Sequence, residues 1–184
     1  MDLPYSLLSE LEKVQDKSLP PVHLWQPENE KDIDLVIEQD GTWQYEGTPI
    51  KRPRLIKLFS SVLRKDGDDY FLVTPVEKCR IQVEDVPFQG ILMEVEGEGQ
   101  AQRLMVTTDV GEQVTINREH PLRIQQAGEQ WVPYVMIRGG LEARLNRNVY
   151  YQLANLMVEN AHPETVENWL CILSDGDVFP MMPA

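Results

Sequence analysis

The stretch ILMEVEGEGQAQRLMVTTDVGEQVTINREHPLRIQQAGEQWVPYVMI, residues 91–137, decides the fold. Short apolar and β-branched runs alternate in it with the turns Gly97-Glu-Gly99, Asp109-Val-Gly111 and Ala127-Gly128. This spacing is typical of a meandering antiparallel sheet or a small barrel. We therefore predict five strands, over Ile91–Glu96, Arg103–Thr108, Gln113–Asn117, Leu122–Gln126 and Trp131–Ile137.

The sequence on either side of this stretch contains further strands and helices. Apolar residues alternate over Asp32–Glu38, an Asp-Gly turn follows, and Trp43 and Tyr45 share one face of a return strand. Pro53–Lys65 has a single apolar stripe, which predicts a helix. The other expected elements are strands over Tyr70–Thr74 and Cys79–Glu84 and helices over Ser6–Gln15 and Glu142–Asn160. Val166–Leu173 is expected to form either a last strand or a short helix followed by a strand.

These elements predict an α+β protein of two small domains, which 184 residues are enough to form. Trp43-x-Tyr45, a glycine, Arg52 and a helix are echoed by Tyr134-x-Met136, a glycine, Arg147 and a helix, which indicates a duplicated strand–turn–helix element. The expected divisions are an N-terminal helix and linker over residues 1–21, an α+β domain over 22–88, and a β-rich domain with one long helix over 89–184.

The composition excludes several classes of protein. Lys and Arg number 17 against 30 Asp and Glu, a net charge of −13, which argues against a general binder of nucleic-acid polymers and against docking on an anionic membrane. The longest apolar run, Trp169–Leu173, is far shorter than the about 20 residues of a membrane span, and the N-terminus does not read as a secretory signal. We expect a cytoplasmic protein in which Cys79 and Cys171 are small buried hydrophobes.

Catalytic and metal-binding motifs are absent from the sequence. It has no phosphate-binding loop, no H-E-x-x-H, no C-x-x-C and no G-x-S-x-G, and its three histidines are isolated. We therefore assign no catalytic residue, no metal ligand and no known cofactor. An enzyme with an unrecognised site stays the least favoured interpretation, with the acid–base groups Glu77, Lys78, Glu84 and Asp85 near Tyr70 as its candidates.

Two basic segments are candidates for binding an anion. The first is Gly47–Arg54, where Lys51, Arg52 and Arg54 stand at the start of the predicted helix. It forms either an anion pocket or a solvated helix face. Extending the helix backwards places Arg52 towards the apolar stripe, where an unpartnered charge is costly, and this favours a functional role for Arg52.

The second segment is Arg138–Arg147, in which two glycines precede Arg144 and Arg147. Glu142 is expected to pair either with Arg144 or with a partner across the domain boundary. A plain strand-to-helix turn with surface arginines is an equally good interpretation. If the two halves pack face to face, both arginine-bearing turns line one cleft.

The chain resembles a bacterial family, domain of unknown function 1285 (DUF1285). The motifs that carry the resemblance are Asp40–Leu55, Leu58–Leu63, Tyr70–Lys78, Val83–Phe88, Pro133-Tyr134 and Gly140–Arg147. The resemblance implies a two-domain core with duplicated elements and a C-terminal β-rich antiparallel roll that is loosely pleckstrin-homology-like. It also implies a role in signal transduction and a site at the domain interface for a nucleotide-like ligand. It supplies no catalytic residues.

Together these observations predict a module that binds a small anionic, nucleotide-like ligand. Arg52 and Arg147 would hold phosphate. An aromatic ring of Trp43, Tyr45 or Tyr134 would stack on a base, and Thr48 and Glu142 would orient the ligand. The remaining candidates are Arg54, Lys78 and Arg144. The main alternative is a protein–protein adaptor that uses the β-rich C-terminal domain.

Overall fold

The computed structural model describes residues 7–9, 18–165 and 167–184, and strands predominate in it, with 51% strand and 17% helix. The helix predicted over Ser6–Gln15 lies mostly outside the described residues. Its described part, residues 7–9, is helical. The chain divides into two compact units, Met1–Asp85 and Val86–Ala184. In the described part of the chain, no helix has the length and apolar character needed to cross a membrane.

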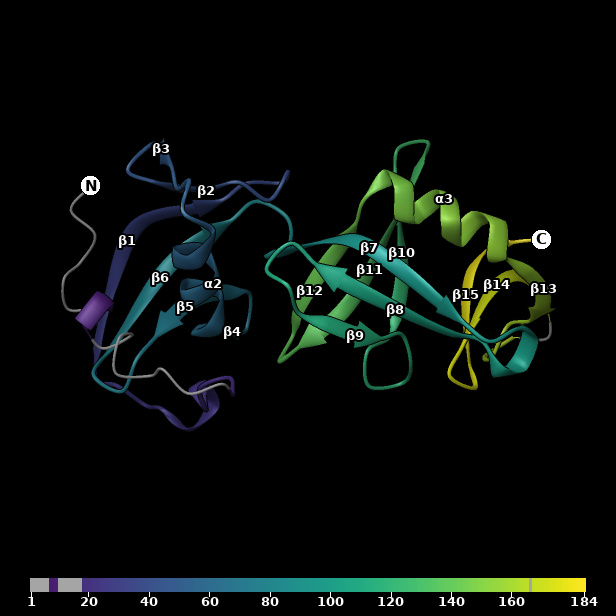
Figure 1. Cartoon of the computed structure of the whole chain (residues 1–184), viewed down its shortest axis with the longest axis horizontal. Helices are drawn as coiled ribbons and strands as arrows, with labels where there is room; N and C mark the ends of the chain where they lie inside the picture. Colours follow the sequence, from purple (N-terminus) through teal and green to yellow (C-terminus); the bar gives the residue numbers. More distant parts are fainter. Residues whose placement is uncertain (1–6, 10–17, 166) are drawn as a thin grey trace. The chain divides into compact units, whose positions relative to one another are not determined.

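The N-terminal unit contains the 3-10 helix η1 (Val22–Leu24), the helix α2 (Pro53–Ser61) and six strands, namely β1 (Asn29–Ile37), β2 (Trp43–Tyr45), β3 (Thr48–Pro49), β4 (Leu63–Asp66), β5 (Asp69–Val73) and β6 (Glu77–Val83). The strands form one sheet in the order β3-β2-β1-β6-β5-β4 (Figure 1). The central strands β1 and β6 run parallel, and the other neighbouring pairs run antiparallel.

The prediction of a helix over Pro53–Lys65 is wrong at its C-terminal end. Helix α2 ends at Ser61, and β4 begins two residues later. Leu63 is fully buried and pairs with Leu72 of β5, and the Val73 amide donates to the Val62 carbonyl. Sheet pairing therefore overrides the helical period at these residues, because tertiary context outweighs local propensity.

Arg52 does not lie towards the apolar stripe of α2, which corrects the backward extrapolation. Its backbone is extended, with φ −97° and ψ 104°, so the helical period does not reach it. The side chain is exposed, as are those of its neighbours Lys51 and Arg54. The desolvation argument for Arg52 therefore no longer applies.

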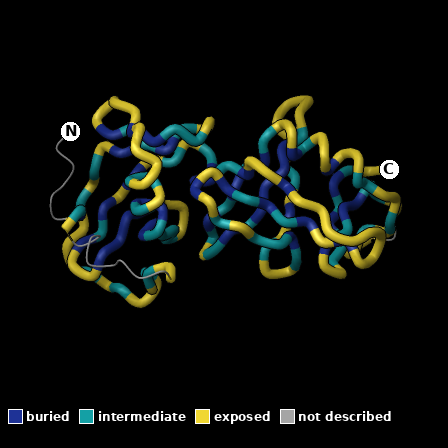
Figure 2. Tube along the Cα trace, in the orientation of Figure 1, coloured by how far each residue is buried: buried dark blue, intermediate teal, exposed yellow. Residues whose placement is uncertain are grey.

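The core of the N-terminal unit forms where α2 meets the sheet. Phe59 is fully buried and stacks on Trp43, with ring centroids 6.4 Å apart and an interplanar angle of 16°. Leu35 and Ile37 of β1 are buried with them. Figure 2 shows the buried segments along the strands and the exposed ones mainly at turns. This accounts for the period-two alternation predicted for β1.

The C-terminal unit contains six strands that form a second sheet: β7 (Phe88–Glu96), β8 (Arg103–Thr108), β9 (Gln113–Thr115), β10 (Leu122–Ala127), β11 (Gln130–Arg138) and β12 (Leu141–Leu145). Their order is β10-β11-β12-β7-β8-β9. The predicted antiparallel meander is confirmed within β7-β8-β9 and within β10-β11-β12, while β7 and β12 pair in parallel.

The long helix predicted over Glu142–Asn160 is wrong at both ends. Residues 141–145 form β12, whose side chains alternate between buried and half-buried, and the helix α3 covers only Arg147–Leu156. The residues that follow enter a third sheet of β13 (Val158–Ala161), β14 (Asn168–Ser174) and β15 (Asp177–Pro183). Apolar residues at helical spacing thus continue through β12, α3 and β13, although only α3 is a helix.

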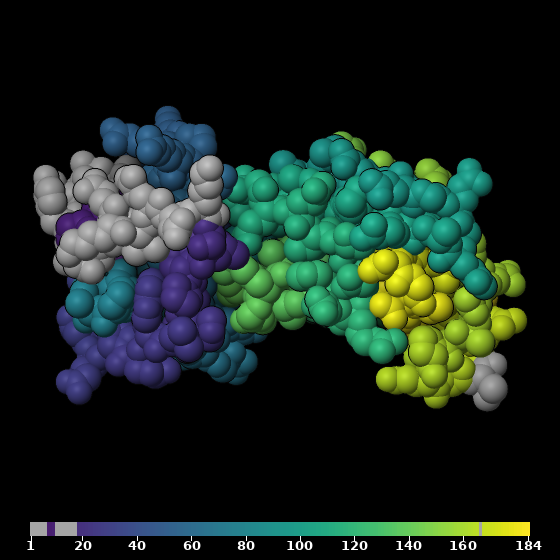
Figure 3. All heavy atoms as spheres, turned by 60° about the horizontal axis from the view of Figure 1, so that its bottom comes forward, coloured from purple at the N-terminus to yellow at the C-terminus, as the bar shows by residue number. Residues whose placement is uncertain are grey.

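The third sheet is joined to β8 by hydrogen bonds near the short 3-10 helix η2 (Gly99–Ala101). Gln102 Nε2 donates to the Leu173 carbonyl at 2.8 Å, and the Leu104 amide donates to Ser174 Oγ at 3.0 Å. The adjacent C-terminal segment is the yellow part of the surface in Figure 3. Ser174 is buried and has this partner, so the C-terminal strands belong to the folded unit.

The two six-stranded sheets share one connectivity. In each, the first and sixth strands form the central parallel pair, and three-stranded meanders extend from it to both edges. The helix follows the third strand in the N-terminal unit and the sixth strand in the C-terminal unit. The sequence echo aligns Trp43 of a second strand with Tyr134 of a fifth, so it does not follow this shared order.

Both cysteines are buried and free, as the sequence predicts. Burial, and next the nearby Glu77 carboxylate, together raise the pKa of the Cys79 thiol to about 11. Burial also raises the pKa of the Cys171 thiol. Both thiols are therefore protonated near neutral pH and are poor nucleophiles.

Replacing Phe59 with Ala should lower the free energy of unfolding of the N-terminal unit by about 3–5 kcal/mol, because it leaves a cavity beneath α2. The matched control is Lys57→Ala on the exposed side of the same helix, which should change it by less than about 0.5 kcal/mol. Urea unfolding followed by tryptophan fluorescence measures both. Equal losses for the two variants would contradict the packing described.

Candidate functional site

A pocket of about 520 Å³ opens where β12 gives way to α3 in the C-terminal unit. All of its lining residues belong to Val86–Ala184, and they come from four places in the fold. These are Gln89 of β7, residues 129–133 of the β10–β11 hairpin, residues 144–147 at the β12–α3 junction, and Tyr150 and Tyr151 of α3.

Asn146, which lines this pocket, holds the junction between β12 and α3 in place. Its Oδ1 accepts a hydrogen bond from the Val149 amide at 3.0 Å, which caps the first turn of α3. The backbone amide of Asn146 donates to the Gly90 carbonyl at 3.0 Å, and its side-chain Nδ2 donates to the Ile91 carbonyl at 3.3 Å. A Cβ at Gly90 would clash with the Cδ2 methyl of Leu145, so a larger residue there would force the buried Leu145 side chain to move. The start of α3 is therefore held against β7.

Two cations of the C-terminal unit line the pocket, Arg144 and Arg147. The unit has six arginines and no lysine. The other four arginines each bind a carboxylate, in the pairs Arg103–Asp175, Arg118–Asp177, Arg123–Glu142 and Arg138–Glu112. The Arg147 Nε donates to the Tyr151 hydroxyl at 3.0 Å, and its guanidinium carbon lies 5.8 Å from the centroid of that ring. Arg147 is thus oriented by a tyrosine, and among the residues that the structure describes no carboxylate forms an ion pair with it.

Aromatic side chains surround these arginines. Trp131 and Tyr150 are half-buried, and Tyr151 is 51% exposed. The rings of Tyr150 and Tyr151 lie 6.0 Å apart between centroids. Val132, Pro133 and Leu145 add apolar lining. The pocket therefore combines cationic groups with flat apolar surfaces, which suits a ligand that has both an anionic and an aromatic part.

Polar groups of the lining complete the chemistry. The amide side chains of Gln89 and Gln130 can both donate and accept hydrogen bonds, and Glu129 contributes a carboxylate. Among the described residues, no group of three or more His, Cys, Asp and Glu side chains could hold a metal ion.

Of the ten predicted ligand residues, Arg144 and Arg147 line the pocket, and Tyr134 and Glu142 lie beside it. Tyr134 pairs with Arg144 across β11 and β12 but is only 4% exposed. The guanidinium of Arg123 lies 4.2 Å from the centroid of the Tyr134 ring and makes hydrogen bonds of 2.6 and 3.0 Å to Glu142. Glu142 therefore pairs with Arg123, a partner that the sequence did not indicate.

The other six candidates lie in the N-terminal unit, outside the lining of this pocket. Trp43 and Tyr45 are 1% and 7% exposed, so their rings belong to the core. Thr48, Arg52 and Arg54 are exposed. Lys78 is engaged in an ion-pair network on one face of the sheet.

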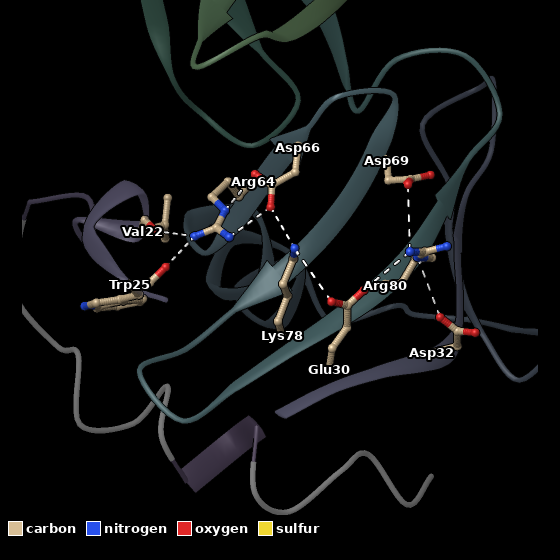
Figure 4. Close-up of polar contacts among 9 residues, drawn as sticks. All are labelled: Val22, Trp25, Glu30, Asp32, Arg64, Asp66, Asp69, Lys78 and Arg80. Carbon is tan, nitrogen blue, oxygen red and sulfur yellow. Dashed lines mark hydrogen bonds and ion pairs between the residues drawn. The ribbon is translucent and has the colours of Figure 1, made fainter. Parts of the chain in front are cut away.

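That network joins side chains of β1, β4, β5 and β6 (Figure 4). Lys78 Nζ lies 2.9 Å from Asp66, 3.9 Å from Glu30 and 3.9 Å from the centroid of the Phe71 ring. Arg64 binds Asp66 and also donates to the carbonyls of Val22 and Trp25, at 2.8 and 2.7 Å. Arg64 thus ties the segment around η1 to β4, and Lys78 joins β6 to β4 and β1, which is a structural role for both side chains.

Sequence reasoning missed Trp131, Tyr150 and Tyr151 as pocket residues. Tyr150 falls inside the helix that the sequence predicts to begin at Glu142, so nothing marked it as part of a pocket. The signal that locates the true helix start is Asn146, since asparagine is a preferred N-cap and follows the last buried residue of β12.

Comparison with known families agrees with this architecture. Residues 20–86 match the N-terminal domain of a domain of unknown function, DUF1285, and residues 87–181 match the C-terminal domain of that family. The chain belongs to the DUF1285 family. The border between the two DUF1285 matches falls one residue from the border between the two compact units.

Two solved DUF1285 structures are similar to this chain. A DUF1285 family protein from Silicibacter pomeroyi DSS-3 is 41% identical with a TM-score of 0.87, over 97% of this chain and 95% of that one. A DUF1285 family protein from Shewanella baltica OS155 is 32% identical with a TM-score of 0.53, over 66% of this chain and 90% of that one. Comparison with curated proteins gave no match.

Replacing Asp66 with Asn should destabilise the N-terminal unit at pH 7 by up to about 1 kcal/mol, as expected for a partly exposed ion pair. Hydrogen bonds from Arg64, and then from Lys78, lower the pKa of the Asp66 carboxyl. A lowered pKa stabilises the fold above the unfolded-state value of about 3.9, and this stabilisation is lost as the pH falls through the folded-state value.

The difference between wild type and Asp66→Asn should therefore shrink below about pH 4. Urea unfolding midpoints at pH 7, 5 and 3 test this. Asp68→Asn, an exposed residue of the same hairpin turn, is the matched control and should show little effect. A difference for Asp66→Asn that stays constant down to pH 3 would show that the network does not depend on the ionised carboxylate.

Proposed function

We propose that this protein binds a small anionic ligand with a planar aromatic group, such as a nucleotide, in the pocket at the β12–α3 junction. The observation that carries the proposal is that Arg144 and Arg147 line the same pocket as Trp131, Tyr150 and Tyr151. The volume of about 520 Å³ falls in the usual range for small-molecule sites.

The anionic part of the ligand would lie against the arginines and the first turn of α3. Guanidinium groups form paired, charge-assisted hydrogen bonds with phosphate or carboxylate oxygens. The first amides of a helix have no partners within the helix, and its N-terminus carries partial positive charge. Arg147 lies at this N-terminus, so both sources of positive potential act on one region of the pocket.

The planar part would lie against Trp131 and Tyr150. Both are half-buried, which leaves ring surface available to a ligand, in contrast to the buried Trp43 and Tyr45. Gln89, Gln130 and Glu129 would give hydrogen bonds to the hydroxyl or amino groups of a base or sugar. The Glu129 carboxylate would repel a phosphate, so the phosphate is expected at the arginine side.

A ligand-binding module that serves signal transduction in a bacterial cytoplasm is the role that we infer from such a pocket. We also propose that the two six-stranded sheets arose by duplication of one sheet, because both units share one strand order. The likeness of the C-terminal unit to pleckstrin-homology folds stays a prediction.

Nucleotides, cyclic dinucleotides and dinucleotide cofactors should be screened by thermal shift, with phosphate and sulfate as anion controls. A ligand at a hundred times its Kd stabilises the folded state by about 2.7 kcal/mol. Isothermal titration with the best ligand should then show a loss of affinity of about tenfold or more for Arg147→Gln, because charge-assisted hydrogen bonds contribute about 1.5–3 kcal/mol.

Arg118→Gln is the matched control, since it removes the same charge from a side chain that is 90% exposed and lies outside the pocket lining. It should leave the affinity within about twofold, as expected for a screened surface charge. If no nucleotide shifts the melting temperature at millimolar concentration, or if Arg118→Gln weakens binding as much as Arg147→Gln, the pocket is not the site.

A further inference from the structure

Four exposed cations lie together where β3 leads into α2. They are Lys51, Arg52, Arg54 and Lys57, and we refer to them as the basic strip. Residues 47–65 contain no Asp or Glu, although the chain as a whole has 30 acidic residues against 17 basic ones. The strip is thus a concentrated positive charge on a strongly acidic protein.

The other described cations of the N-terminal unit have partners. Lys31, Arg64, Lys78 and Arg80 bind carboxylates, and Lys65 Nζ lies 5.4 Å from the centroid of the Tyr70 ring. Within residues 7–9, 18–165 and 167–184, no carboxylate forms an ion pair with any residue of the basic strip. In the described part of the unit, the cations of the sheet contact carboxylates or a ring, whereas the four side chains of the strip are exposed.

The shape of the strip indicates what kind of anion fits it. Arg52 has extended backbone, whereas Arg54 and Lys57 lie three residues apart on α2 and so share one side of the helix. A single phosphate contacts one or two such side chains, but four cations spread over seven residues match several separated negative charges. Leu55, Ile56 and Leu58 are half-buried between and beside them, which adds some apolar surface.

We propose that the basic strip is a docking surface for an acidic segment, rich in Asp and Glu, of a partner protein. A short acidic segment can follow the strip without approaching the rest of the surface. A flat anionic membrane or a nucleic-acid polymer would also meet the acidic remainder of the protein and be repelled by it, since the whole chain carries a net charge of −13. Charge complementarity of this kind mainly speeds association and selects the partner.

The test uses a fluorescein-labelled peptide of ten glutamates and the full chain, with binding followed by fluorescence anisotropy at low salt and at physiological salt. The double variant Arg52→Gln, Arg54→Gln should bind the peptide about fivefold more weakly, because two exposed ion pairs with the peptide are lost. The matched control is Arg103→Gln, Arg118→Gln, which removes the same two charges from the C-terminal unit and should bind as the wild type does. Both variants change exposed side chains and should keep the melting temperature of the wild type.

Binding that falls at physiological salt and is lost selectively in the strip variant supports the proposal, because screening weakens exposed charge pairs. Retention of peptide binding by Arg147→Gln also supports it and separates the strip from the pocket. The proposal is overturned if the wild type does not bind the peptide at low salt or if both double variants weaken binding equally. The proposal is also overturned if inorganic phosphate displaces the peptide at a concentration equal to that of the peptide. It is overturned as well if the protein binds phosphatidylserine vesicles more tightly than it binds the peptide.

Discussion

The parallel pairing of β7 with β12 is the constraint on which the C-terminal unit depends. It joins the first and last strands of the sheet, with Phe88 opposite Ala143, Gln89 opposite Arg144 and Gly90 opposite Leu145. This register brings Gln89 beside Arg144 at the pocket and leaves the Gly90 carbonyl free to accept from Asn146. Helix α3 begins directly after Asn146. The position of the pocket therefore follows from the register of this single strand pair.

Much of the fold could be predicted from the sequence wherever turn residues separate short alternating runs. Arg103–Thr108 was predicted with the observed bounds, because a glycine turn or an Asp-x-Gly turn stands on either side of it. The helices were extended too far, since Leu63 and Leu145 fit a helical stripe as well as a strand face. Only their partners across the sheet, Leu72 and Gly90, decide between the two, and local periodicity does not contain that information.

The candidate site was predictable in its charges but not in its aromatic groups. Arg144 and Arg147 follow a glycine turn ahead of a helix, and that local pattern survives in the structure. Trp43 and Trp131 both read as strand aromatics, yet the first is enclosed by α2 while the second lies past the end of β12 and stays partly open. Which face a strand aromatic presents, and whether a neighbouring strand continues beside it, depend on long-range pairing.

The same closing pair affects how the protein folds during synthesis. Phe88–Gly90 cannot acquire their parallel neighbours until Ala143–Leu145 have left the ribosome, so one edge of β7 stays open while all the intervening strands are made. An open strand edge can pair with other chains. In the N-terminal unit β1 likewise waits for β6, but over a shorter length of chain. The period of greatest exposure to aggregation should therefore come late in translation, when the N-terminal unit is already complete.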